Sequence, residues 1–311
     1  MRVLFMGTPD FAAECLRAVY HKSGVEVVGA VSQPDKPKGR GMKLIPTPVK
    51  LYAESVGIPV YQPATVKDNA FLDVLTELDP ELIIVAAYGK ILPGYLLSYP
   101  KYGCVNAHGS LLPKYRGASP IQRALINGET VTGITAMYMA EGLDTGDMIL
   151  KKETAITPED DFGTLHDRLA LLGGEAMCEV IDCINAGNVP REQQNDGEST
   201  YAPKILKEDT MVDFNRPAAE LFNLIRGLSP TPLAVTHTPD GKLLKLTSSV
   251  ALDETADAAP GTVVSLEDGR ITVACGVGCL AVTGVVPEGK SRMGADAYIR
   301  GRKIAVGDIL K

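Results

Sequence analysis

The sequence is most informative at Glu81-Leu82-Ile83-Ile84-Val85-Ala86-Ala87, in which every residue after Glu81 is apolar. A strand that is apolar on both faces is typical of a parallel sheet covered by helices on each side. Comparable strands are predicted at Arg2–Met6, Val25–Val31 and Gly103–His108. Together they indicate a sheet whose neighbouring strands are joined by other elements.

Helical periods separate these strands. Apolar residues recur at helical spacing from Phe11 to Val19 and again over Asp160–Gly187, a long amphipathic segment. Ser119–Ile126 is a further helix candidate, and Val131–Met139 alternates like a strand. This alternation of strand and helix predicts an α/β class: a doubly wound, mostly parallel sheet.

The pattern changes after Asn188–Glu208, a polar segment that predicts a linker. Beyond it come one helix, Asn215–Gly227, and several short strands, with hairpin signals at Asp240-Gly241 and Asp268-Gly269. We therefore predict a catalytic domain over residues 1–189, a linker over 190–207 and a small OB-like β-barrel domain over 208–311.

Composition excludes several classes of protein. Of 311 residues, 45% are hydrophobic and 22% charged, which is too apolar for a disordered chain. The net charge of −7 argues against a protein whose whole surface binds nucleic acid. No apolar run approaches the roughly 20 residues that span a bilayer, and no signal peptide is visible, so we expect a cytoplasmic protein without a membrane partner. Six cysteines without a Cys-x-x-Cys pair, and only four histidines, predict reduced thiols and no metal site.

Chemistry is predicted where the strand Gly103–His108 ends in Asn106-Ala107-His108. Strand residues two apart share a face, and ligands of open α/β sheets bind beyond the carboxyl ends of the strands. Asn106 can donate to a developing oxyanion, and His108 can transfer a proton near neutral pH. Asp144, on a glycine-flanked loop, can orient the imidazole. Each of the three also has a structural reading, as a capping, packing or turn residue.

The order of these motifs resembles the 10-formyltetrahydrofolate-dependent formyltransferases. The resemblance rests on Asn106-x-His108, Ser110-Leu111-Leu112-Pro113, Tyr115-Arg116-Gly117, Leu143-Asp144-Thr145-Gly146-Asp147, the first turn Gly7-Thr8-Pro9-x-Phe11-Ala12 and the loop Gln33–Lys50. It covers essentially the whole chain, and it is close for the branch that formylates methionyl-tRNA.

The resemblance implies a function and a set of site residues. Asn106, His108 and Asp144 would be catalytic, with no metal involved. The folate site would include Ser110, Leu111, Leu112, Pro113, Tyr88, Gly89 and Ile91. The formyl donor would be 10-formyltetrahydrofolate, and the acceptor would be the α-amino group of initiator methionyl-tRNA.

Two basic stretches bear on the acceptor. Residues 35–50 and 289–303 each carry five Lys or Arg against one Asp. The first is a long Gly- and Pro-rich loop, where Lys and Arg suit RNA phosphates. We expect contacts to tRNA from Arg40, Lys38 and Lys43. The alternative acceptor is a small amine, either a nucleotide amino sugar or a purine precursor, which would not need two basic stretches.

Two other classes of protein fit the sequence less well than a formyltransferase does. A non-catalytic RNA-binding module would not need the intact trio of Asn106, His108 and Asp144. A nucleotide-binding dehydrogenase would show Gly-x-Gly-x-x-Gly after its first strand, whereas Gly7-Thr8-Pro9-Asp10-Phe11-Ala12 has one glycine. We expect the protein to act as a monomer.

Overall fold

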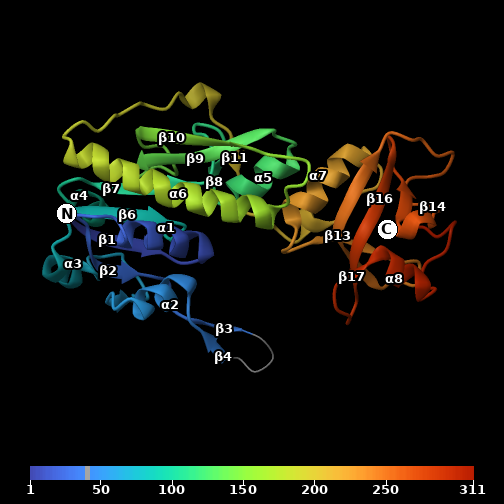
Figure 1. The fold of residues 1–311 in the computed structure, drawn as a ribbon, viewed down its shortest axis with the longest axis horizontal. Coiled ribbons are helices and arrows are strands. Elements are labelled where there is room, and N and C mark those ends of the chain that lie inside the picture. The colour runs from blue at the N-terminus through green and yellow to red at the C-terminus, as the bar shows by residue number, and fades with distance from the viewer. Residues whose placement is uncertain (39–42) are drawn as a thin grey trace. The chain divides into compact units, whose positions relative to one another are not determined.

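The computed structural model describes residues 1–38 and 43–311 (Figure 1). The chain divides into two compact units. Unit 1 comprises Met1–Gly117, Val131–Thr154 and His166–Ala202, and unit 2 comprises Ala118–Thr130, Ala155–Leu165 and Pro203–Lys311. Two short segments of the N-terminal part thus group with unit 2, which the boundaries proposed from the sequence do not include. Those boundaries stay a prediction.

A seven-stranded sheet, counted over the described residues, forms the centre of unit 1. Its strands are β1 (Arg2–Gly7), β2 (Glu26–Val31), β5 (Val60–Tyr61), β6 (Leu82–Ala86), β7 (Cys104–His108), β9 (Val131–Tyr138) and β10 (Met148–Ala155), in the order β10-β9-β7-β6-β1-β2-β5. The five neighbouring strands β7, β6, β1, β2 and β5 pair in parallel. Strand β9 pairs with β7 in antiparallel fashion. The mostly parallel α/β sheet predicted from the sequence is confirmed.

Helices connect the parallel strands of unit 1. They are α1 (Asp10–Tyr20), α2 (Pro48–Ser55), α3 (Leu72–Leu78) and α4 (Gly94–Ser98). The long helix α6 (Phe162–Asn185) follows β10. Crossovers between parallel strands are right-handed, so α1 and α2 lie on one face of the sheet. The chain then reverses its direction across the sheet, and the same rule therefore places α3 and α4 on the other face. Leu4, Ile83 and Leu75 share the buried cluster on the α3 and α4 side. The sheet is therefore doubly wound, and its carboxyl edge stays open for a site.

The basic loop of residues 35–50 contains a short hairpin. β3 (Lys36–Lys38) pairs with β4 (Lys43–Ile45), and Lys38 stands opposite Lys43. Arg40, predicted to contact tRNA, lies outside the described residues. At the root of the hairpin, Lys50 Nζ donates to Asp35 at 2.7 Å, and Gln62 Nε2 donates to the same carboxylate at 2.7 Å. These hydrogen bonds, from Gln62 first and then Lys50, lower the pKa of Asp35, so the root is anchored.

Unit 2 is built on an antiparallel sheet. Its strands are β12 (Ala234–His237), β13 (Leu243–Leu252), β14 (Val263–Ser265), β15 (Ile271–Ala274) and β16 (Cys279–Pro287), in the order β12-β13-β16-β15-β14, with β17 (Met293–Gly294) on β16. Its helices are α5 (Pro120–Ile126), α7 (Ala218–Leu228) and α8 (Ala295–Arg300). The predicted hairpin turns, Asp240-Gly241 and Asp268-Gly269, join antiparallel neighbours.

Residues 307–311 connect the two ends of this sheet order. The Gly307 N–H donates to the Val263 carbonyl of β14 at 2.8 Å, and Lys311 exchanges two backbone hydrogen bonds with His237 of β12, at 2.7 and 3.0 Å. Because β12 and β14 are the first and last strands of the order, this segment covers both open edges. The small barrel-like β domain predicted from the sequence is confirmed.

Among the described residues, no helix has the length and apolarity that crossing a bilayer requires.

Candidate active site

Asn106 and His108 lie on one face of β7, at the edge where the parallel strands end. Asn106 pairs with Val85 of β6, and His108 pairs with Thr135 of β9. His108 is buried, with 5% of its surface exposed, whereas Asn106 is half-buried. Within residues 1–38 and 43–311, no protein group is hydrogen-bonded to the Asn106 amide. Its two N–H donors therefore remain for a ligand.

The His108 ring is held in one tautomer. Its Nε2 lies 2.8 Å from the Tyr115 carbonyl oxygen. A carbonyl oxygen can only accept, so Nε2 carries the proton and donates it. Nδ1 is then the nitrogen that can take up or release a proton at the site.

Asp144 approaches this same nitrogen. Its Oδ2 lies 3.6 Å from His108 Nδ1 and accepts a hydrogen bond from the Gly117 N–H at 2.8 Å. Asp144 itself has a left-handed backbone, with φ at 51°, which Asp tolerates better than most residues. The structure thus brings His108 and Asp144 together beside Asn106. The catalytic roles predicted for the three stay a prediction.

The sequence analysis missed the groups that support this pair. They are the Tyr115 carbonyl, the Gly117 N–H and the side chain of Gln194. Tyr115 and Gly117 belong to a quoted motif, but they contribute through their backbones, which residue type does not reveal. Gln194 lies in the predicted linker and contacts residues about fifty positions away, so no local spacing marks it.

The segment predicted to line the folate site is mostly turned inward. Ser110 is fully buried, and its Oγ donates to the Lys114 carbonyl at 2.7 Å. Leu112 is 1% exposed, and its N–H donates to Thr135 Oγ1 at 3.0 Å. Leu111 and Pro113 are half-buried. The Ser110 N–H and carbonyl and the Leu112 N–H are hydrogen-bonded within the protein, and the assignment of all four residues to the folate site stays a prediction.

The loop after β6 is shaped by its backbone. Tyr88 points its ring into the core, where burial raises the pKa of its hydroxyl to about 12, and its carbonyl accepts from Gln33 Nε2 at 2.8 Å. Gly89 has φ at 77°, which favours glycine, and a Cβ there would displace the Gln33 side chain from its hydrogen bond with Tyr88. Ile91 is 77% exposed. The loop therefore presents backbone at Gly89 and an apolar side chain at Ile91, and the folate contact predicted here also stays a prediction.

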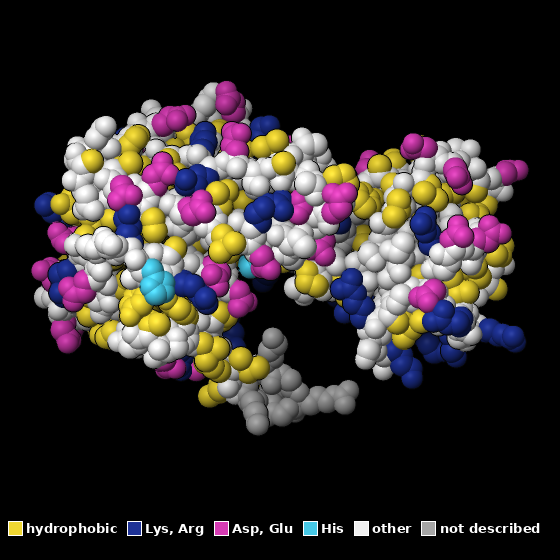
Figure 2. Space-filling model, in the orientation of Figure 1, with side chains coloured by type: hydrophobic (Ala, Val, Ile, Leu, Met, Phe, Trp, Pro, Cys, Tyr) yellow, Lys and Arg dark blue, Asp and Glu magenta, His cyan; other side chains and the backbone are white. Residues whose placement is uncertain are grey.

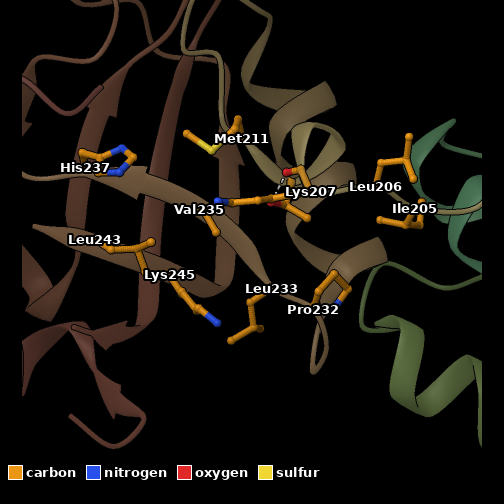
Figure 3. Close-up of a pocket in the computed structure, with 11 residues that line it drawn as sticks. Ile205, Leu206, Lys207, Met211, Pro232, Leu233, Val235, His237, Leu243 and Lys245 are labelled. Atoms are coloured by element: carbon orange, nitrogen blue, oxygen red, sulfur yellow. Dashed lines mark hydrogen bonds between the residues drawn. The ribbon is translucent and has the colours of Figure 1, made fainter. Parts of the chain in front are cut away.

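Unit 2 carries a groove of about 460 Å³ (Figure 3). Its walls are mostly apolar and include Ile205, Leu206, Met211, Pro232, Leu233, Val235 and Leu243. Lys207, from the segment before β12, and Lys245, from β13, also line it. No carboxylate of the described chain lies within 4.0 Å of either ammonium group. Ammonium groups without a carboxylate partner can contact phosphates.

A second basic surface lies on unit 2. Figure 2 shows Lys and Arg side chains gathered over the region of β17 and α8. Lys290, Arg292, Arg302 and Lys303 are exposed there, while Arg300 pairs with Asp296 at 2.7 Å. The stretch that the sequence analysis singled out by charge is therefore a surface patch.

Comparison with known proteins gives a consistent picture. A family model described as "Formyl transferase" matches residues 1–181, and one described as "Formyl transferase, C-terminal domain" matches residues 204–303. The chain is 48% identical to a methionyl-tRNA formyltransferase of Caldanaerobacter subterraneus subsp. tengcongensis, with 100% of both chains covered. It is 45% identical to that of Syntrophus aciditrophicus, over 99% of this chain and 98% of the relative.

Solved structures resemble the fold at low sequence identity. An N-formyltransferase from Helicobacter canadensis, in complex with folinic acid and dTDP-3-aminofucose, matches with a TM-score of 0.65 at 18% identity, covering 90% of this chain and 98% of the other. HypX from Aquifex aeolicus, in complex with tetrahydrofolic acid, matches with a TM-score of 0.64 at 16% identity, covering 97% and 47%. These likenesses concern the fold alone.

Proposed function

Since the chain belongs to the formyl transferase family, we propose that it transfers the formyl group of 10-formyltetrahydrofolate to the α-amino group of initiator methionyl-tRNA. The full-length relatives support the reaction and the RNA acceptor. The observation that carries the proposal for this chain's own residues is the His108–Asp144 pair beside Asn106. The product serves translation initiation, so we place the enzyme in the cytoplasm, and we propose no metal.

The reaction needs three things from the protein. The amine attacks the formyl carbon, the formyl oxygen becomes negative in the tetrahedral intermediate, and the bond from carbon to N10 then breaks. The amine must lose a proton and N10 must gain one. Holding both substrates together makes the attack effectively unimolecular.

The geometry of the site supports a role for each residue. The Asn106 amide has no protein partner in the described chain and can donate to the formyl oxygen. His108 Nδ1 can take the amine proton, because Nε2 is occupied by the Tyr115 carbonyl. Asp144 lies 3.6 Å from Nδ1 and stabilises the positive ring once that proton has arrived.

Cationic surfaces support RNA as the acceptor. We propose that the hairpin of β3 and β4 contacts phosphates through Lys38, Lys43 and Arg40, and that unit 2 adds contacts through the groove with Lys207 and Lys245. Such contacts position an RNA without reading its sequence. A small amine acceptor would not need two such surfaces.

The proposal is tested by offering acceptors side by side. With 10-formyltetrahydrofolate as donor, formyl transfer is measured to methionyl initiator tRNA, free methionine and a nucleotide amino sugar. We expect product on the tRNA alone. Transfer only to the amino sugar would overturn the acceptor assignment, and transfer to none of the three would overturn the enzyme itself.

Replacing Lys245 by Ala is expected to weaken methionyl-tRNA binding. Losing one phosphate contact should raise KM for the tRNA several-fold and lower the salt slope of log affinity by about 1, while KM for folate stays unchanged. The matched control is Lys242→Ala on the same strand region, because Lys242 already pairs with Asp240. Equal losses in both variants, or an unchanged salt slope in Lys245→Ala, would exclude the groove as an RNA contact.

A further inference from the structure

We propose that Gln194 is a positioning residue for the reaction, because it holds Asp144 in place beside the His108 ring. Gln194 lies in residues 191–202, here called the strap, which the sequence predicts as a linker. The inference rests on the proposed function, since it concerns how the same site is held.

The Gln194 side chain is almost completely buried, with 7% exposed. Its Nε2 donates to the Asp144 carbonyl and to the Gly146 carbonyl, both at 2.8 Å. Its Oε1 accepts from Arg116 Nε at 3.0 Å. Both amide hydrogens and the amide oxygen are thus used. One buried side chain therefore joins the Asp144 loop to the segment that also supports His108.

The strap also fixes the other side of the pair. Thr200 Oγ1 accepts from the Tyr115 N–H at 2.8 Å, and the Thr200 carbonyl accepts from the Arg116 N–H at 2.9 Å. β11 (Tyr201–Ala202) then pairs in parallel with β8 (Arg116–Gly117). Tyr115 supplies the carbonyl for His108 Nε2, and Gly117 supplies the N–H for Asp144. Both members of the catalytic pair are therefore supported by backbone that the strap holds.

Loss of Gln194 would act on Asp144 in particular. Two loop carbonyls and the Arg116 Nε would lose their partner, and Asp144 would have less support for its left-handed backbone. A shift of the carboxylate by about 1 Å can cost about 10²-fold in rate. The substrates would still bind, because Gln194 is buried and is not among the residues proposed to contact folate or tRNA.

The chain offers a closely matched control. Gln193 is the adjacent residue, of the same type, and it is exposed. We expect Gln194→Ala to lower kcat by about 10²-fold with KM for folate and tRNA changed less than about 3-fold, and Gln193→Ala to match the wild type. If Gln194→Ala folds poorly, Gln194→Met is the second variant: it has a similar length and no donors or charge, and the same loss of kcat is expected of it.

A double-mutant cycle separates positioning from general stability. If Gln194 acts through Asp144, then Gln194→Ala should cost about 10²-fold in the wild type and less than about 3-fold in the Asp144→Asn background. Equal fold losses in both backgrounds would overturn the proposal.

A readout that needs no turnover keeps the inference apart from the proposed function. The chain has four histidines, so the NMR signals of the His108 ring can be assigned with variants in which one histidine at a time is replaced. We expect the His108 ring resonances to move in Gln194→Ala in the same direction as in Asp144→Asn, and to stay in place in Gln193→Ala. Unmoved resonances in Gln194→Ala would overturn the positioning role, whereas wild-type failure to formylate tRNA would overturn only the function.

Discussion

Replacing His108 by Ala is expected to lower kcat for formyl transfer to methionyl-tRNA by about 10³-fold or more. The variant loses Nδ1, the one ring nitrogen that the Tyr115 carbonyl leaves available for proton transfer. It also removes the hydrogen bond from Nε2 to that buried carbonyl, which should cost about 1–3 kcal/mol of folding stability. Single-turnover transfer rates and thermal unfolding, measured together, separate the two effects.

His108→Gln distinguishes chemistry from packing. Its amide can still donate to the Tyr115 carbonyl, but it cannot take up a proton at neutral pH. We therefore expect it to be more stable than His108→Ala and equally inactive. His21→Ala, at the exposed end of α1, is the control and should keep wild-type activity. A fully active His108→Gln would mean that His108 is a packing residue.

Asp144→Asn is expected to lower the rate by about 10²-fold while leaving the fold intact. The substitution keeps the shape, and the amide oxygen can still accept the Gly117 N–H that the carboxylate accepts at 2.8 Å. What disappears is the negative charge 3.6 Å from His108 Nδ1, and with it the stabilisation of the charged ring. The rate is best measured as a function of pH, because the loss acts through the protonation of His108.

Asp147→Asn is the matched control for this variant. It removes a carboxylate from the same loop, one that pairs with Arg191 at 3.6 Å, away from the imidazole. We expect little change in rate. If Asp144→Asn keeps both the wild-type rate and the wild-type pH profile, Asp144 is a structural residue of the turn and has no part in the reaction.

Burial and period explain what the sequence could predict. β1, β6 and β7 are short apolar runs that must be covered on both faces, and α6 repeats its apolar residues at helical spacing, so each was predicted to within two residues. Asn106 and His108 could be placed on one face because the period of a strand is two.

Elements without such a period were missed. The hairpin of β3 and β4 lies in a loop rich in Lys, Gly and Pro. The ion pair between Asp35 and Lys50, which lies at its base, joins residues 15 positions apart. α2 has a usable signal, Thr47 as N-cap followed by Pro48, that was not interpreted.

The supporting contacts of the site could not be predicted because they join distant segments through backbone atoms. The Tyr115 carbonyl and the Gly117 N–H are backbone groups, so the residue type does not mark them as part of the site. Gln194 has the right chemistry, but it looks like any polar residue of a linker until the strap is seen to return to unit 1. Sequence patterns thus locate the side chains proposed to react, and tertiary structure reveals what holds them.

The most direct test is a crystal structure with a donor analogue that keeps the N10-formyl group, 10-formyl-5,8-dideazafolate. The formyl oxygen should lie within hydrogen-bond distance of Asn106 Nδ2, with the formyl carbon beside His108 Nδ1 and Asp144. A formyl group bound away from Asn106, with His108 and Asp144 remote from it, would contradict the assignment of this edge of the sheet as the place of transfer.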